Sequence, residues 1–157
     1  MCMILNDYII MQLDVFALEK EAQLGDWTRS EIDKIRKWRD SIFYQTREES
    51  EIKKDRCEIC YSKEDLERLQ LHHPAGIKHD YRTTTACIEC HTWLSNRQKI
   101  WDRRWLEENQ PENIRLAFFL LGMKDIFELK SIKTGNSLYL RLGESYTEKI
   151  SALFGRL

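Results

Sequence analysis

The stretch that decides the fold begins with Cys57-Glu58-Ile59-Cys60 and ends with Cys87-Ile88-Glu89-Cys90-His91. All four histidines of the chain and four of its five cysteines lie within this stretch. Two C-x2-C pairs can supply four thiolates to one tetrahedral zinc ion, and in a reducing compartment they indicate metal binding rather than disulfides. We therefore expect Cys57, Cys60, Cys87 and Cys90 to hold a structural Zn²⁺, with Cys2 left over.

The segment between the two cysteine pairs has the pattern of a β-hairpin followed by a helix. Leu69-Gln70-Leu71-His72 alternates as a strand does, and Pro74-Ala75-Gly76 ends it. Thr83 to Ala86 is rich in β-branched residues and predicts a second short strand. A helix then starts at the second cysteine pair and continues through Trp101. So small a core buries little, so the zinc ion would hold the cysteine turn, the hairpin and the helix together.

Helices are predicted on the N-terminal side of this core. Residues 6–24 are expected to be helical, and Thr28 with Glu31 forms a capping box for the next helix. Trp27 and Ile32 fit the hydrophobic staple that accompanies such a cap. The apolar face of this helix continues to about residue 50.

Helices are also predicted on the C-terminal side. Pro111 suits the first turn of a long apolar helix that ends near Gly135-Asn136. Leu138, Leu140 and Leu142 alternate, which fits either a strand or a helix. Ser145 and Glu148 predict a capping box before a final amphipathic helix.

These elements predict a single α+β domain over residues 1–157 that is mostly helical. Its centre, residues 52–106, is expected to be a small zinc-bound ββα-metal core of treble-clef type. Residues 1–51 form the N-terminal helical extension and residues 107–157 the C-terminal one. The flanking helices are candidates for a homodimer interface.

Composition limits the function classes. Hydrophobic residues make up 42% and charged residues 32% of the 157, which is the profile of a folded chain rather than a disordered one. The net charge is −1, but residues 52–105 are more basic than the flanks, which hints at a polyanionic partner. The sequence shows no secretory leader and no apolar stretch of membrane-spanning length, so we expect a cytoplasmic protein with no membrane contact.

The histidines indicate chemistry beyond a structural zinc clip. His72 and His73 end the first predicted strand, where adjacent side chains point to opposite faces. One imidazole can then bind a metal while the other faces a substrate. His91 follows Cys90 directly, so folding of the helix over the hairpin would bring His91 beside His72. Two imidazoles would then flank a second metal whose remaining positions are open to water and phosphate oxygens.

Three motifs of the chain together resemble the HNH endonucleases, members of the ββα-metal or His-Me finger group. They are Cys57-x2-Cys60, Leu71-His72-His73-Pro74-Ala75-Gly76 and Cys87-x2-Cys90-His91. The resemblance implies metal-dependent hydrolysis of phosphodiester bonds, with double-stranded DNA as the expected substrate. It also implies that His73 is the general base and that His72 and His91 bind a catalytic Mg²⁺ or another divalent ion.

The chain departs from the family pattern at two places. Arg82, Thr83 and Thr84 stand where the family has an asparagine that orients the base, so His79 and Asp80 are the candidates for that role. Ser95 stands one helical turn after His91, where a further histidine is common. An alternative hypothesis is therefore a catalytically inactive treble-clef zinc module that binds nucleic acid or a protein partner.

Basic side chains surround the predicted site and are candidates for contacts with nucleic acid. Phosphate contacts supply much of the affinity for DNA, and the same residues would fit a solvated helix face equally well. The candidates are Lys78, Arg82, Arg97, Lys99, Arg103 and Arg104.

Overall fold

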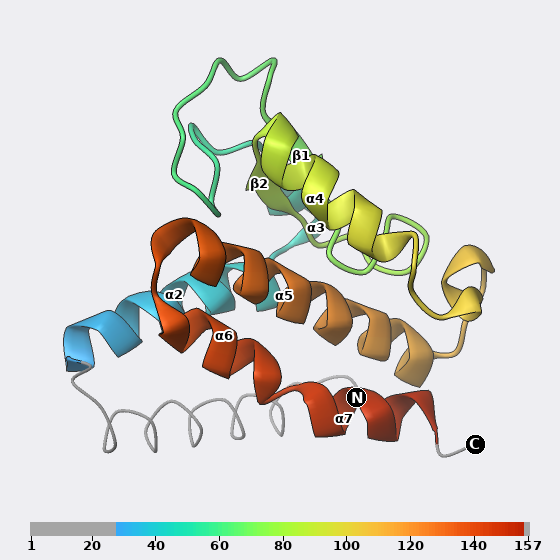
Figure 1. Cartoon of the computed structure of the whole chain (residues 1–157). Helices are drawn as coiled ribbons and strands as arrows, with labels where there is room; N and C mark the ends of the chain where they lie inside the picture. The colour runs from blue at the N-terminus through green and yellow to red at the C-terminus, as the bar shows by residue number, and fades with distance from the viewer. Residues whose placement is uncertain (1–27, 156–157) are drawn as a thin grey trace.

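The computed structural model describes residues 28–155, so the helix expected over residues 6–24 and the staple at Trp27 lie outside the described residues. The described chain is mostly helical and contains one two-stranded sheet, as predicted. Along the sequence, two helices come first, the hairpin and α4 follow, and three further helices complete the fold (Figure 1).

Helix α2, Arg29–Phe43, begins at the predicted capping box, in which Thr28 and Glu31 bond to each other's backbone N–H groups. The expectation that its apolar face continues to about residue 50 is wrong, because α2 ends at Phe43. A second capping box, formed by Thr46 and Glu49, starts the one-turn helix α3, Arg47–Ser50. The chain therefore turns between the end of α2 and the cap of α3, although the apolar periodicity alone favours one continuous helix.

The predicted hairpin and the helix after it are both present. Strand β1, Gln70–His72, pairs antiparallel with β2, Thr84–Ala86, and His72 lies opposite Thr84. Helix α4, Ile88–Gln98, follows β2. It is shorter than predicted, so Trp101 lies beyond it and Trp105 lies in the 3-10 turn η1, Arg103–Leu106.

The longest helix, α5, spans Glu112–Thr134, after Pro111 and before Gly135, whose φ of 71° is left-handed. The segment in which Leu138, Leu140 and Leu142 alternate is helical and forms α6, Ser137–Glu144. Helix α7, Thr147–Phe154, has no side-chain cap, so the predicted capping box is wrong. The Ser145 hydroxyl instead donates to the carbonyl of Leu142 at the end of α6.

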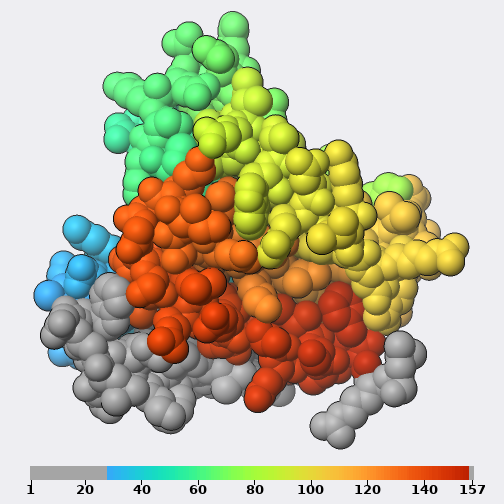
Figure 2. Space-filling view, in the orientation of Figure 1, coloured from blue at the N-terminus to red at the C-terminus, as the bar shows by residue number. Residues whose placement is uncertain are grey.

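Helix α5 is the centre of the molecule. The hairpin and α4 lie on one side of it, whereas α6 and α7 lie on the other (Figure 1). On the face drawn in Figure 2, the side chains of α4 lie directly against those of the C-terminal helices. Phe118, Phe119 and Phe127 of α5 are fully buried. No helix within residues 28–155 has the length and apolarity that crossing a membrane requires.

The turn after β1 touches the backbone of α5 at one glycine. A Cβ atom built on Gly122 would lie 1.8 Å from the carbonyl oxygen of Pro74, far inside any permitted contact. The same turn is held from α4, because the side-chain amide of Gln98 donates to the carbonyls of His73 (2.9 Å) and Pro74 (3.2 Å). Only glycine lets the central helix approach so closely.

Replacing Gly122 with alanine should therefore destabilise the fold by about 3 kcal/mol, since the clash is with backbone that cannot rotate away. Chemical denaturation measures the change in the free energy of unfolding. Gly135→Asn is the matched control, because Gly135 faces open space and asparagine tolerates its left-handed φ. This variant should lose less than about 1 kcal/mol. Equal losses in the two variants would contradict the close approach.

Candidate metal centre and the histidines beside it

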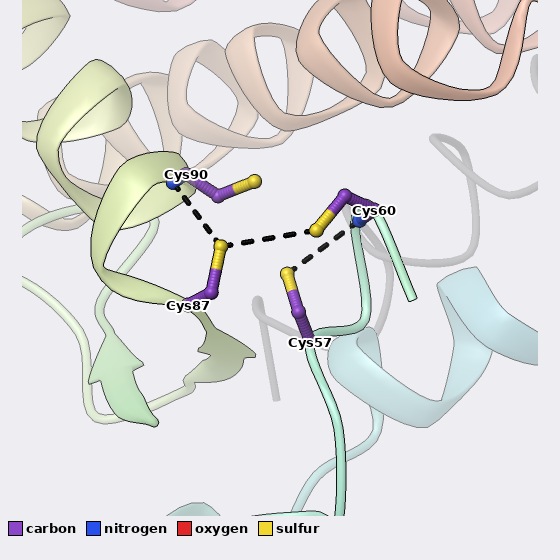
Figure 3. A group of neighbouring side chains, drawn as sticks. All are labelled: Cys57, Cys60, Cys87 and Cys90. Atoms are coloured by element: carbon purple, nitrogen blue, oxygen red, sulfur yellow. Dashed lines mark hydrogen bonds between the residues drawn. The ribbon is translucent and has the colours of Figure 1, made fainter. Parts of the chain in front are cut away.

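The first cysteine pair lies in a tight turn that its own backbone closes. The N–H of Tyr61 donates to the carbonyl of Cys57 (3.0 Å), and the N–H of Cys57 donates to the carbonyl of Ser62 (3.0 Å). Tyr61 has a φ of 63°, in the left-handed region that costs a non-glycine residue about 1 kcal/mol or more. The turn adopts this conformation while directing the thiols of Cys57 and Cys60 inward (Figure 3).

The second pair faces the first from the start of α4. Cys87 is the N-cap residue of α4 and Cys90 lies in its first turn. The four sulfur atoms all lie within 4.8 Å of one another, and those of Cys60 and Cys87 are 3.8 Å apart (Figure 3). Sulfur atoms that bind one tetrahedral zinc at about 2.3 Å are separated by about 3.8 Å. The predicted gathering of the four cysteines is confirmed, and the group is able to hold a metal ion such as zinc.

The surroundings of the sulfur atoms favour a thiolate at Cys57 and protonated thiols at Cys87 and Cys90. Backbone N–H groups of Cys60 and Cys90 approach the sulfur atoms of Cys57 and Cys87, respectively, each at 3.5 Å. A hydrogen bond from Cys90, helped by backbone N–H groups that include that of Cys60, lowers the pKa of Cys57 to about 4 against the opposing effect of burial. The same hydrogen bond raises the pKa of Cys90. The cluster thus holds negative charge already, and a divalent ion would displace the remaining protons.

Glu58, between the first two cysteines, ties their turn to the hairpin. Its carboxylate accepts from the hydroxyl of Thr84 (2.9 Å) and the N–H of Thr85 (2.6 Å). It also accepts from the indole of Trp38 on α2 (3.3 Å) and pairs with Lys54. No signal in the sequence indicates this residue, since a glutamate between two metal ligands is expected at a solvated position. It is only 7% exposed.

Lys130 of α5 reaches the same turn. The sequence did not predict a role for it. Its ammonium donates to the main-chain carbonyl of Glu58 (2.5 Å) and lies 3.4 Å from the centre of the Trp38 ring. Burial lowers the pKa of Lys130 to about 7, while the charges of Glu58 and Cys57 act in the opposite direction. A lysine inside an apolar helix is the only sequence signal that could have indicated an internal cation.

The histidines expected to meet do so. His72, at the buried end of β1, and His91, in the first turn of α4, have ring centroids 5.4 Å apart with nearly perpendicular planes. The Nδ1 atom of His91 lies 3.3 Å from the hydroxyl of Ser95. Ser95 stands at the position where the resemblance implies a further histidine. The fold therefore brings two imidazoles together beside the cysteine cluster.

The imidazoles of His72, His73 and His91 are all neutral near pH 7. Burial, followed by the charges of His91 and His73, lowers the pKa of His72 to about 3. Burial also lowers the pKa of His73, although the carboxylate of Asp80 opposes that shift. The pKa of His91 is lowered by burial as well. Neutral imidazoles keep the lone pairs that metal binding and proton acceptance require.

Two predicted site residues, His79 and Arg82, are buried and bond to other parts of the protein. His79 is buried, its Nε2 lies 2.7 Å from the carbonyl of Trp105, and its ring packs against Phe118. Arg82 is also buried, donates to the carbonyl of Phe43 (2.9 Å), and pairs with Asp80 (2.8 Å). The burial and internal bonds of Arg82 disagree with a nucleic-acid contact for this residue. An orienting role for His79 is not seen within the described residues, because its Nε2 faces the carbonyl of Trp105 and its Nδ1 has no hydrogen-bond partner.

The remaining basic residues differ in how free they are. Arg97 pairs with Asp125 (3.5 Å) and Glu128 (2.6 Å) of α5, so it links α4 to the central helix. Arg104 pairs with Asp102 and donates to the carbonyl of Phe154. Lys78, Lys99 and Arg103 are exposed, although Lys78 also pairs with Glu108 (3.8 Å) and Lys99 donates to the side chain of Asn96 (3.2 Å).

Comparisons with known proteins add no relative. No protein-family model matches the chain, and neither a curated protein nor a solved structure is significantly similar to it. Within residues 28–155, the four cysteines are the one group of three or more histidine, cysteine or carboxylate side chains with ligand atoms gathered for a metal. His72 and His91 thus offer two ligands, and a second ion would need the rest from water or substrate.

Metal content gives a direct check on the cysteine cluster. Protein purified without chelator should carry one zinc ion per chain, and Co²⁺ substitution should give the visible bands of a tetrahedral thiolate site. Cys90→Ser should abolish stoichiometric binding, because three thiolates hold the ion far less tightly. The fifth cysteine supplies the control, and Cys2→Ser should retain full metal content. Metal-free wild-type protein in elemental analysis would contradict the site.

Proposed function

We propose that the chain is a metal-dependent endonuclease of the HNH type that hydrolyses phosphodiester bonds, with double-stranded DNA as its substrate. In this proposal the four cysteines bind a structural zinc ion that holds a treble-clef ββα core, and the protein acts in the cytoplasm. The observation that carries the proposal is the meeting of His72 and His91, whose ring centroids are 5.4 Å apart, with His91 directly following Cys90 in α4.

The chemistry of the histidines supports distinct roles. His72 and His91 are neutral and close together, so they could supply two ligands to one divalent ion, with water and phosphate oxygens completing the shell that Mg²⁺ or Mn²⁺ prefers. Such an ion would stabilise the charge that develops on the phosphate and on the leaving oxygen. His73 follows His72 directly and is only half buried, so its imidazole suits removal of a proton from the attacking water.

Asp80 is the best candidate to replace the missing asparagine. Its negative charge raises the pKa of His73 against the effect of burial, so the two side chains lie within electrostatic range. Asp80 is itself held firmly, because its carboxylate accepts from the backbone N–H of Arg82 (2.8 Å) and from the Arg82 side chain. Arg82 therefore serves the proposed site indirectly, by fixing Asp80.

A second candidate function is a zinc module that binds nucleic acid or a protein partner without cleaving. Two observations favour it: no third ligand from residues 28–155 joins the two histidines, and Arg97 and Arg104 are engaged in ion pairs within the chain. The first proposal accounts better for three neutral imidazoles at one place, which a structural zinc clip does not need.

His73→Ala should lower the cleavage rate by at least about 100-fold, the usual contribution of a positioned general base. Plasmid nicking with Mg²⁺, Mn²⁺ or Ni²⁺ measures this rate, and zinc content should stay unchanged. His79→Ala is the matched control on the same loop, and its nicking rate per folded molecule should match that of the wild type. A wild-type protein that binds DNA yet never cuts would favour the zinc module.

The pH dependence of cleavage follows from His73. A general base must be deprotonated, and burial lowers the pKa of His73 below the ordinary value of 6.5. The rate should therefore rise with pH, with an acidic midpoint below 6.5, and be constant by neutral pH. Single-turnover nicking between pH 4.5 and 8 measures the profile. Asp80→Asn should move the midpoint to still lower pH, whereas an unchanged midpoint would exclude Asp80 as the orienting residue.

A further inference from the structure

Lys130 is a cation in the interior of the protein. It is 1% exposed, although lysine is among the residues least often found fully buried. Its ammonium lies over the ring of Trp38 at 3.4 Å, with the rings of Tyr61 at 4.7 Å and Tyr139 at 5.2 Å. Its hydrogen-bond acceptor is the carbonyl of Glu58, inside the turn that carries the first two cysteines.

This cation has no carboxylate of its own. Among the ion pairs of the described residues, none within 4.0 Å involves Lys130. The nearby carboxylate of Glu58 pairs with Lys54 and accepts from Thr84 and Thr85. Aromatic faces and the charge of Glu58 favour the ammonium, yet burial still lowers the pKa of Lys130 to about 7. A further negative charge close by would therefore stabilise the charged form.

The cysteine cluster can supply that charge. Four thiolates around one divalent zinc leave a net charge of −2 at the centre. Cys57 is near enough for its charge to act on Lys130, and Lys130 bonds to the residue directly after it. The charges of Cys90 and Cys60 also act on Lys133, the next lysine of α5, but Lys133 is partly exposed and already paired with Glu89 (2.5 Å), so solvent screens its effect on the cluster.

We propose that Lys130 is the internal counter-ion of the metal centre, so that metal binding by the four cysteines and docking of helix α5 on their turn stabilise each other. The inference assumes that the cysteines hold zinc, and it does not depend on nuclease activity. The loaded centre neutralises a cation that the central helix buries, and the cation in turn raises the affinity for the metal. Such coupling is reciprocal by thermodynamic necessity.

Zinc affinity in the full-length chain tests the proposal, measured by competition with a chromophoric chelator. Lys130→Met keeps the length of the side chain but removes its charge, and it should weaken zinc binding by about 10-fold to 100-fold. Lys130→Gln can still donate to the Glu58 carbonyl, yet it should lose affinity similarly, because it is neutral. Lys133→Met is the matched control on the same helix and should change the affinity by less than about threefold.

The stability of the metal-free protein separates a counter-ion from a merely structural lysine. Without the thiolate–metal centre the buried cation is a burden, so Lys130→Met should leave the urea midpoint of the apo-protein unchanged or raise it. A lower apo midpoint that accounts for the whole loss of affinity would overturn the proposal. Unchanged affinity in both neutral variants would also overturn it, and if Lys130→Met does not fold, Lys130→Gln decides. If the wild type takes up no zinc, it is the metal site itself that fails.

Discussion

The gathering of four cysteine sulfur atoms within 4.8 Å is the constraint on which the rest of the structure depends. Thiolates so close together repel one another unless a cation lies between them, so the arrangement is stable in a reducing environment chiefly with a metal bound. The first cysteine turn has almost no apolar side chain of its own to bury apart from Ile59. It is placed by polar contacts instead, from Glu58 to the hairpin and from Lys130 to Glu58.

Those contacts also fix the positions of the proposed catalytic residues. Glu58 binds β2, β2 pairs with β1, and β1 ends at His72, opposite Thr84. Cys87 and Cys90 fix the start of α4, which sets the position of His91 one residue later. The imidazoles therefore meet because both strand and helix are tied to the same four sulfur atoms. If the cysteines bind a metal, its loss would release both at once.

Local sequence patterns predicted the elements whose signals are local. The doubled C-x2-C spacing, the capping box at Thr28 and the left-handed Gly135 each act within a few residues, and each is present. Errors arose where two local signals competed. The apolar period of α2 favoured a longer helix, but the cap at Thr46 starts a new one. The hydroxyl of Ser145 bonds to a carbonyl at the end of α6 rather than capping the start of α7.

Long-range polar contacts explain what the sequence could not predict about the site. His79 and Arg82 looked accessible because they lie in a loop, yet Arg82 lies 3.5 Å from the centre of the Phe119 ring on α5, and His79 packs on Phe118. Lys130 and Glu58 are charged residues of types that are mostly exposed, and both are buried here. Only the path of α5, which passes Pro74 at Gly122, decides which charged side chains become internal.

The placement of His72 gives the strongest argument that the centre does more than hold the fold. It is 3% exposed and its charged form is strongly disfavoured there. A leucine or valine would fill this strand position without burying polar atoms. The structural work of the four cysteines requires no imidazole, and neither does the pairing of β1 with β2. A neutral imidazole buried at His72 costs stability, and it offers a metal-binding lone pair beside the partly exposed His91 in return. The proposed chemistry therefore gives His72 a role that packing alone does not.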